Sequence, residues 1–339
     1  MLRIIDTKEN GHSGSFRVLS MFERLSRKEI LCKEEEAKRF RVDKKTIQRD
    51  IEELRTYWGD SENNQGLGEI KYCKKNKGYM LIGNSETWLT NEQILAAARV
   101  LLESRAFSKN EMDELLKKLV LQCHPAEAKR IKEIISNELH HYVAVQHGKP
   151  LLQSIWELSQ AVREQKLVKI SYRRIDQEVV ERLIKPQGVM FAEYYFYLIG
   201  NIHDKDFNDP SVYRIDRILS YQITEDKFSF PYVNRFEEGQ FRKRVQFMQT
   251  GKMIKIQFKY WGVSEEAILD RLPNARVVKR EDNIRYIEAE VFGRGIKMWL
   301  LSQAEYLEVL SPPEFRAEIE DTIERMNKIY RKAEPLLES

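Results

Sequence analysis

The chain has 339 residues, of which 42% are hydrophobic and 32% are charged, and its formal net charge is +4. This length exceeds what one ordinary hydrophobic core organises, so two or three domains are expected. No run of about eighteen apolar residues occurs, and the first residues lack the apolar core of a secretion signal. Three isolated cysteines fit neither a disulfide framework nor a zinc site. We therefore expect a cytoplasmic protein with no membrane partner, no metal and no cofactor.

The basic surplus of the chain is concentrated in its first quarter. Residues 1–85 contain 18 Lys and Arg against 14 Asp and Glu, whereas the rest of the chain is balanced. A modest local excess of this kind indicates where a polyanionic partner should be sought.

Three helices are predicted in this quarter, over residues 15–27, 33–40 and 44–58. Asp43 precedes the third helix in the position of an N-cap. The third helix has one apolar face at the spacing i, i+4, i+7 and i+11, formed by Ile47, Ile51, Leu54 and Trp58. With this face inward, a helical wheel turns four residues outward and leaves two on the flanks: Lys45, Arg49, Glu52 and Thr56, then Thr46 and Gln48.

Two short helices joined by a tight turn, with Lys, Gln and Arg on the free face of the second, predict a helix-turn-helix. An α-helix fits the major groove of duplex DNA, where Arg and Lys donate to guanine, Gln bonds adenine and Thr contacts the thymine methyl group. The alternative is a group of amphipathic helices whose charged faces are only solvated.

A β-hairpin is predicted directly after these helices. Residues 69–73 and 79–82 have strand character, and the segment 74–78 between them carries three lysines. Asn76 and Gly78 are expected to supply the positive φ angles of the turn. A hairpin with a basic tip beside a recognition helix is a wing placed over backbone phosphate, and its binding should weaken with salt.

Residues 37–54 resemble the helix-turn-helix of DeoR-type regulators. The specific part is the run Thr46-Ile47-Gln48-Arg49-Asp50-Ile51-Glu52-Glu53-Leu54, and Arg41 departs from the pattern because a turn glycine is common there. The resemblance implies that Thr46 and Arg49 lie at the DNA. The candidate DNA-binding residues are Lys44, Lys45, Thr46, Gln48, Arg49, Lys74, Lys75 and Lys77.

Residues 86–147 are predicted as a helical linker. Thr90 with Gln93, and Ser108 with Glu111, have the spacing of a capping box. The leucine-rich helices are interpreted as core within the chain, and a dimer interface is the alternative.

From Lys166 the pattern changes to short strands with tight connections. Residues 167–173 alternate, which assigns Val168, Ile170 and Tyr172 to one face and Lys169, Ser171 and Arg173 to the other. Further strands are predicted at 179–184, 188–191, 195–200 and 212–221. Five short strands predict a small, strongly bent β-barrel.

Residues 167–223 resemble the WYL domain, an Sm-like five-stranded β-barrel. The resemblance rests on segments 170–173, 185–189, 196–198 and 213–218, with Phe196 in place of the family's tryptophan and Ser211 where many relatives have arginine. It implies a basic groove for a negatively charged effector, such as a nucleotide or a single-stranded nucleic acid. The implied effector-binding residues are Ser171, Tyr172, Arg173, Arg214 and Arg217. The alternative is a solvated strand face in which Arg217 pairs with Asp216 or another carboxylate.

The remaining residues predict a β-α-β-β-α-β order, which is ferredoxin-like. Segments 293–302 and 308–313 resemble the extension that follows WYL domains, which is associated with dimer contacts and with the effector groove. Gly293 and Gly295 do not form a nucleotide-binding fingerprint, because no third glycine follows.

The predicted fold class is therefore α+β in four parts: a winged helix-turn-helix (1–85), a helical linker (86–147), a WYL domain (148–230) and a WYL extension (231–339). The combination resembles bacterial WYL-domain transcriptional regulators, which implies a homodimer that binds double-stranded DNA and senses an anionic effector. The alternative is an accessory protein that binds RNA or single-stranded nucleic acid through the barrel. No phosphate-loop, metal or nucleophile motif occurs, so no enzymatic activity is expected.

Overall fold

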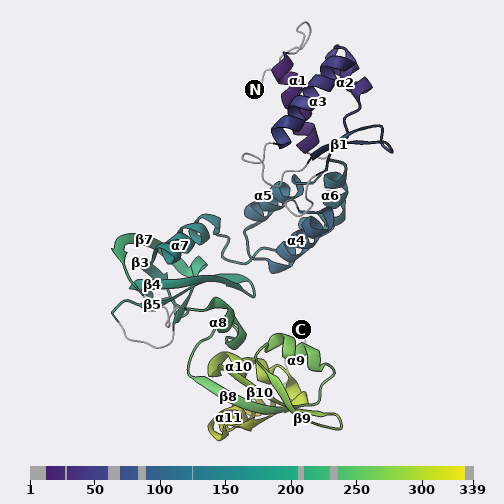
Figure 1. Cartoon of the computed structure of the whole chain (residues 1–339). Helices are drawn as coiled ribbons and strands as arrows, with labels where there is room; N and C mark the ends of the chain where they lie inside the picture. The colour runs from purple at the N-terminus through teal and green to yellow at the C-terminus, as the bar shows by residue number, and fades with distance from the viewer. Residues whose placement is uncertain are drawn as a thin grey trace, which may run out of the picture. The chain divides into compact units, whose positions relative to one another are not determined.

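The structure is a computed structural model that describes residues 13–26, 29–59, 69–82, 89–123, 125–204, 210–229 and 236–332. The chain divides into two compact units, residues 1–148 and 149–339 (Figure 1). The predicted domain boundaries at residues 85 and 230 lie outside the described residues. No helix among the described residues is long and apolar enough to cross a membrane.

The first unit begins with three helices and a β-hairpin. The elements are α1 (Gly14–Ser26), α2 (Lys33–Phe40), α3 (Lys44–Gly59), β1 (Glu69–Cys73) and β2 (Gly78–Ile82). The predicted inward face of α3 is confirmed, since its four apolar residues are buried together with Met21 and Leu25 of α1. Trp58 also stacks on Phe22, with ring centroids 4.6 Å apart.

A buried ion pair joins α1 to α3. Arg17 and Asp50 are both buried, and the Arg17 guanidinium donates to both carboxylate oxygens of Asp50, with the Nη2–Oδ1 distance at 3.1 Å. The hydrogen bond with Asp50 raises the pKa of Arg17 despite the opposing effect of burial. This contact fixes the rotation of α3 about its own axis relative to α1.

Three further helices complete the first unit: α4 (Asn91–Ser104), α5 (Lys109–Val120) and α6 (Pro125–His140). The predicted capping box at α4 is confirmed, because Gln93 N donates to Thr90 Oγ1 and Thr90 N donates to Gln93 Oε1. Ser108 accepts a hydrogen bond from Glu111 N at the start of α5. Ile94, Leu116 and Ile135, one from each helix, are fully buried.

The second unit begins with α7 (Leu152–Glu164) on a five-stranded antiparallel sheet. The strands are β3 (Lys166–Arg173), β4 (Val179–Ala192), β5 (Tyr195–Ile202), β6 (Ser211–Arg214) and β7 (Ile218–Lys227), in the order β6-β5-β4-β3-β7. Leu158 and Ala161 of α7 pack against Val168, Ile170 and Ile184 of the sheet.

The strand boundaries differ from the prediction in two places. The predicted strands 179–184 and 188–191 form the single strand β4, because a bulge between Pro186 and Gly188 lets both halves pair with β5. The predicted strand 212–221 is interrupted by the 3-10 turn η1 (Ile215–Arg217). The turn is needed because β6 and β7 are the strands at the two opposite edges of the sheet. Among the described residues no ladder joins β6 to β7, so a closed barrel is not observed.

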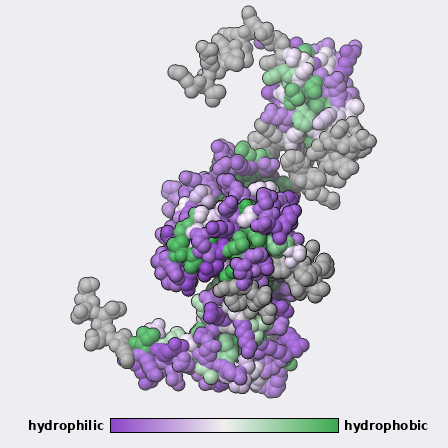
Figure 2. All heavy atoms as spheres, turned by 90° about the vertical axis from the view of Figure 1, so that its left-hand side faces the viewer, coloured by the Kyte–Doolittle hydropathy of each residue, from purple (hydrophilic) through white to green (hydrophobic). Residues whose placement is uncertain are grey.

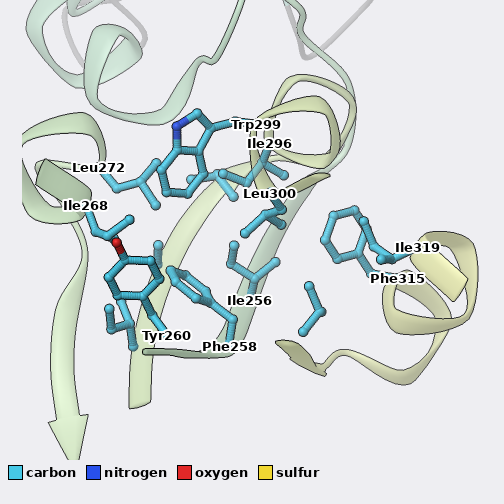
Figure 3. Packing of buried hydrophobic residues seen from close by; sticks show 14 residues of the cluster. Ile256, Phe258, Tyr260, Ile268, Leu272, Ile296, Trp299, Leu300, Phe315 and Ile319 are labelled. Atoms are coloured by element: carbon cyan, nitrogen blue, oxygen red, sulfur yellow. The ribbon is translucent and has the colours of Figure 1, made fainter. Parts of the chain in front are cut away.

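The remainder of the second unit contains a second sheet. Its elements are α8 (Glu238–Arg244), β8 (Met253–Tyr260), α9 (Glu265–Arg271), β9 (Arg276–Glu281), β10 (Ile284–Phe292), α10 (Gly293–Leu301), η3 (Ala304–Tyr306), β11 (Leu307–Ser311) and α11 (Pro313–Lys332). From β8 onward this is the predicted β-α-β-β-α-β order, and the antiparallel sheet has the strand order β11-β8-β10-β9. Figure 3 shows Trp299 and Leu300 of α10 and Phe315 of α11 packed over Ile256 and Phe258 of β8.

The Arg17–Asp50 pair generates a stability prediction. Asp50→Ala should destabilise the packing of α1–α3 by about 3 kcal/mol, because Arg17 would remain buried without its counter-charge. Hydrogen exchange of peptides from residues 13–59 in the full chain measures this loss. Glu35→Ala, which removes an exposed acid from α2, is the matched control. Equal exchange in both variants would contradict the structural role of the pair.

Candidate functional site

The turn between α2 and α3 positions the free face of α3. Arg41 adopts the left-handed conformation, with φ 53° and ψ 47°, and its N–H group bonds carbonyl groups at the end of α2. This explains why a glycine is common there in the resembled family, since glycine adopts such angles without steric cost. Asp43 caps α3 as predicted, with Thr46 N donating to Asp43 Oδ1 at 2.7 Å. That backbone hydrogen bond lowers the pKa of Asp43.

Two of the predicted DNA-binding residues stand outward without a side-chain hydrogen bond or ion pair to the described part of the chain. These are Lys45 and Arg49, one turn apart on α3, and both are exposed. Lys44 is also exposed, but its Nζ lies 2.8 Å from Glu34 Oε1 of α2, and this hydrogen bond lowers the pKa of Glu34 to about 2. Thr46 is half-buried. The first turn and a half of α3 therefore presents a positive face.

Gln48 is half-buried and is held by a hydrogen-bond network that the sequence analysis did not anticipate. Its Oε1 accepts from Lys33 Nζ of α2 at 3.1 Å and from the Tyr79 hydroxyl of β2 at 3.0 Å. Its Nε2 donates to Glu52 Oε1 at 2.6 Å. Gln48 thus connects α2, α3 and the hairpin. No local pattern pointed to this role, because Tyr79 lies 31 residues away along the chain.

The hairpin carries its three lysines, Lys74, Lys75 and Lys77, in exposed positions at the tip. The expected source of the positive φ was wrong: Lys77 adopts it, at 50°, whereas neither Asn76 nor Gly78 does. Gly78 is required for a different reason. A Cβ there would lie 2.5 Å from Ile30 Cγ2 and 3.0 Å from the Leu31 carbonyl oxygen. This close approach allows Leu31 and Tyr79 to exchange two backbone hydrogen bonds of 2.8 Å, which attach the hairpin to the segment before α2.

The second candidate site is a pocket of about 590 Å³ in the second unit. Three predicted effector-binding residues line it: Tyr172, Arg214 and Arg217. Ser171 and Arg173 do not line it, because neighbours of Tyr172 in a strand point to the opposite face. Residues that the prediction missed complete the lining: Arg174, Ile175, Asp176, Tyr197, Ser211, Val212, Phe247, Met248, Gln249, Thr250 and Arg294.

Arg214 is fixed in the wall of this pocket by two contacts. Its guanidinium donates to both carboxylate oxygens of the buried Asp216, at 3.0 and 2.7 Å, and lies 3.3 Å from the centroid of the Tyr195 ring. Burial works against the charge of Arg214, but the hydrogen bonds and the attraction of Asp216 outweigh it and raise the pKa of Arg214. The ion pair with Asp216 that we considered for Arg217 is therefore made by Arg214. It occupies the Nε and Nη2 donors of the Arg214 guanidinium.

Arg217 and Arg294 differ from Arg214, because the described residues offer neither of them a side-chain hydrogen bond or ion pair. Arg217 belongs to η1, between β6 and β7, and Arg294 belongs to α10, after β10, so the two cations reach the pocket from different parts of the second unit. Arg174, in contrast, is paired with Glu178 and Asp176. Burial raises the pKa of Tyr197 to about 12, so this phenol is neutral at physiological pH. The pocket thus combines two uncompensated guanidinium groups with neutral aromatic rings.

A strained turn forms one side of the pocket. Phe247 and Met248 both have a φ of 51°, an unfavourable value for bulky residues, and Gln249 N donates to Gln246 O at 3.1 Å. Packing on both sides holds the turn: Met248 is buried beside Tyr197, and Phe247 contacts the core of the C-terminal sheet. The lining of the pocket is therefore rigid on this side.

No group of three or more metal-ligating side chains occurs within the described ranges of the chain. The guanidinium and ammonium groups described above are side chains of the kind that bind anions such as phosphate.

Comparison with known proteins identifies two domains in the second unit. A WYL domain matches residues 154–223, and a WCX domain matches residues 262–326, so the chain contains both. Among solved structures, it is similar to proteasome accessory factor B/C (PafBC) of Arthrobacter aurescens, at 14% identity over 97% of this chain and 52% of that one, with a TM-score of 0.30. It is also similar to a CRISPR Cas-related protein, at 15% identity over 97% and 89%, with a TM-score of 0.36. No curated protein matches the chain.

The chain spans about half the length of the PafBC chain that it matches. The presence of the WYL and WCX domains agrees with the two resemblances noted in the C-terminal sequence.

The left-handed turn at Arg41 generates a prediction. Arg41→Gly should raise the free energy of unfolding of the α1–α3 segment by about 0.5–1 kcal/mol, because glycine relieves the steric cost of the left-handed conformation. Lys38→Gly is the matched control. It places a glycine inside α2 and should lower the free energy of unfolding by about 1 kcal/mol. Hydrogen exchange in residues 33–59, measured over a series of urea concentrations, gives the free energy of unfolding of both variants. A loss of stability in Arg41→Gly would refute the interpretation.

Proposed function

We propose that the protein is a transcriptional regulator that binds duplex DNA through α3 and the β1–β2 hairpin. The observation that carries the proposal is the orientation of α3. Its apolar face and Asp50 are buried, which leaves Lys45 and Arg49 outward with no side-chain hydrogen bond or ion pair in the described part of the chain.

The charge distribution along α3 supports binding by its N-terminal half. Lys44, Lys45 and Arg49 lie in the first two turns, whereas the exposed acids Glu52 and Glu53 follow. In helix-turn-helix proteins the N-terminal residues of the recognition helix reach the base edges. The acids of the second half would repel phosphate, so they favour the same docking direction.

The contacts of Gln48 change the roles that we propose for the individual residues. Because its amide is occupied by Lys33, Tyr79 and Glu52, we assign Gln48 to positioning the hairpin relative to α3. Arg49, Lys45 and Thr46 remain the candidates for base contacts. Lys74, Lys75 and Lys77 are assigned to phosphate, with which exposed lysines interact as mobile point charges.

We further propose that the pocket in the second unit receives an anionic effector with a planar group, such as a nucleotide or the end of a single-stranded nucleic acid. Arg217 and Arg294 supply uncompensated guanidinium groups, which bind phosphate in a bidentate manner. Tyr172 and Phe247 supply aromatic surface on which a base can stack. Ser171 and Arg173 have no part in this pocket.

Four finer features belong to the same proposal. We propose an Sm-like fold for the five-stranded sheet, although no closed barrel is observed among the described residues. For the C-terminal sheet we propose a ferredoxin-like fold, which the strand order β11-β8-β10-β9 supports. The helix-turn-helix is proposed to be of the DeoR type and the protein to act as a cytoplasmic homodimer. The proposal includes no catalytic step.

A role only in binding single-stranded nucleic acid is the second candidate, which the arginines and tyrosines of the pocket favour.

The duplex-binding proposal is tested by removing one outward cation. Arg49→Ala should weaken binding by about 1–3 kcal/mol if this residue contacts a base edge. The measurement is fluorescence anisotropy on a duplex that the protein itself selects from a random library. Arg130→Ala, which removes an exposed arginine from α6, should leave the affinity unchanged. Equal affinities of the unmodified protein, Arg49→Ala and Arg130→Ala would refute the assignment of α3. Failure to select any duplex would favour the second candidate, binding of single-stranded nucleic acid only.

The effector proposal is tested by comparing an arginine that lines the pocket with one that does not. Arg217→Ala should weaken binding of a labelled single-stranded oligonucleotide at least about tenfold, because a charge-assisted hydrogen bond contributes roughly 1.5–3 kcal/mol. Arg173→Ala should bind within about twofold of the unmodified protein, since that side chain does not line the pocket. Equal losses in both variants would refute the pocket.

A further inference from the structure

One face of the C-terminal sheet is left open by helices α9, α10 and α11, which pack on the other face. Figure 3 shows Leu272 of α9, Trp299 of α10 and Phe315 of α11 in one apolar cluster beside β8. Phe258 and Tyr260 of β8 enter this cluster. Successive side chains of a strand point to opposite faces of its sheet. The residues that alternate with the buried ones therefore lie on the open face.

Three aromatic side chains lie on this open face. Tyr286 of β10 precedes the buried Ile287, and Tyr306 precedes Leu307, which packs against the apolar cluster. Trp261 follows Tyr260 and extends the pairing of β8 with β11, since Trp261 N donates to Tyr306 O at 3.1 Å. Tyr306 is 47% exposed, and Trp261 and Tyr286 are partly exposed. All three rings are thus accessible to a planar group from solvent.

Two lysines flank the central ring. Tyr286 lies opposite Lys279 of β9 and opposite Lys259 of β8, and their Nζ atoms are 5.3 and 5.9 Å from the centroid of the Tyr286 ring. Lys279 also pairs with Glu281, and Lys259 with Glu308. Ion pairs this open to solvent are weak, so a phosphate group can compete for both lysines.

Two further cations of the open face share a single acid. Lys255 Nζ and Arg276 Nη2 lie 3.2 and 2.8 Å from the same Oε2 atom of Glu288. The hydrogen bonds with Arg276 and Lys255 lower the pKa of Glu288 to about 2. The Glu288 side chain is only 14% exposed, whereas those of Lys255 and Arg276 are 67% and 71% exposed. One carboxylate beneath two exposed cations leaves positive charge at the surface, and most of the surface that this domain presents in Figure 2, at the bottom of the view, is hydrophilic.

Aromatic rings interleaved with cations match the chemistry of a single nucleic-acid strand. Every base has a planar face that stacks on an aromatic ring, and the backbone phosphates are attracted to Lys and Arg. RNA-recognition motifs bind single strands in this way on a four-stranded sheet. Trp261 and Tyr286 are diagonal neighbours on adjacent strands, because Tyr286 pairs with Lys259, and such neighbours are about 7–8 Å apart. Two successive bases of an extended strand can therefore stack on them, whereas the bases of a duplex are already stacked on one another.

We infer that the open face of the C-terminal sheet binds single-stranded nucleic acid, with Tyr286 and Trp261 stacked on successive bases. The lysines and arginine of the face hold the phosphates, and Tyr306 extends the aromatic surface. RNA and DNA strands share this chemistry. The surface is separate from the effector pocket, because none of these residues lines that pocket. The inference rests on neither effector binding nor duplex binding, so each can fail without the others.

The test is the binding of labelled oligo(U) and oligo(dT) to the full chain, measured by fluorescence anisotropy. Arg217→Ala serves as the background, because it weakens the proposed pocket. In that background Tyr286→Ala should weaken binding at least about fivefold, since stacking of one base contributes that much or more. Tyr286→Phe keeps the ring and removes the hydrogen bond to Glu281, so its affinity should stay within about twofold. The two strands show whether RNA or DNA binds more tightly.

A matched pair of cations on β9 tests the role of the lysines. Lys279→Ala should weaken binding and reduce its dependence on salt, because one phosphate contact is lost. Arg280→Ala changes the next residue, whose guanidinium bonds Glu265 of α9, and should bind within about twofold of the parent protein.

Photo-crosslinking of 4-thiouridine strands, followed by mass spectrometry, locates the contact without substitution. Crosslinks are expected in residues 253–261 and 284–292. The inference would be overturned by absence of binding in the Arg217→Ala background, by equal affinities of Tyr286→Ala and its parent, or by an equal loss in Tyr286→Phe. Crosslinks confined to the lining of the effector pocket would overturn it as well and would leave the effector proposal intact.

Discussion

Burial of one side of α3 is the constraint on which the proposed DNA interface depends. Four apolar residues and the Asp50 carboxylate occupy that side, and the carboxylate is bound by Arg17 of α1. Apolar burial alone tolerates some rotation of a helix, whereas a bidentate ion pair does not. The outward direction of Lys45 and Arg49 is therefore a consequence of contacts made on the opposite side of the helix.

The hairpin depends on the same helix through a different contact. Gln48 accepts from Tyr79 of β2, and Arg55 of α3 donates to the carbonyl oxygen of Ile70 in β1. These side chains connect the positive face of α3 to the strands that carry the lysine tip. A polar residue on the flank of a recognition helix can thus serve the geometry of the interface without contacting DNA.

The pocket of the second unit illustrates how a paired and an unpaired arginine differ. Arg214 is compensated by Asp216 and stacked on Tyr195, so it contributes shape and a fixed charge to the wall. Arg217 and Arg294 lack such compensation within the described residues and retain their donors for a ligand. Because Arg217 lies in the WYL domain and Arg294 in the WCX domain, an anion bound between them would link the two domains by electrostatic attraction.

The sequence by itself determined the features that depend on neighbours within about five residues. The helices of the first unit, the caps at Asp43 and Thr90, and the alternation of β3 follow from periodicity and local hydrogen bonding, and the structure agrees with them. Only the tertiary structure decided that Gln48 bonds Tyr79, that Gly78 is needed for close approach, and that Arg294 joins the pocket while Arg173 does not. These outcomes depend on which distant segments meet, and a local pattern of residue types contains no information about such meetings.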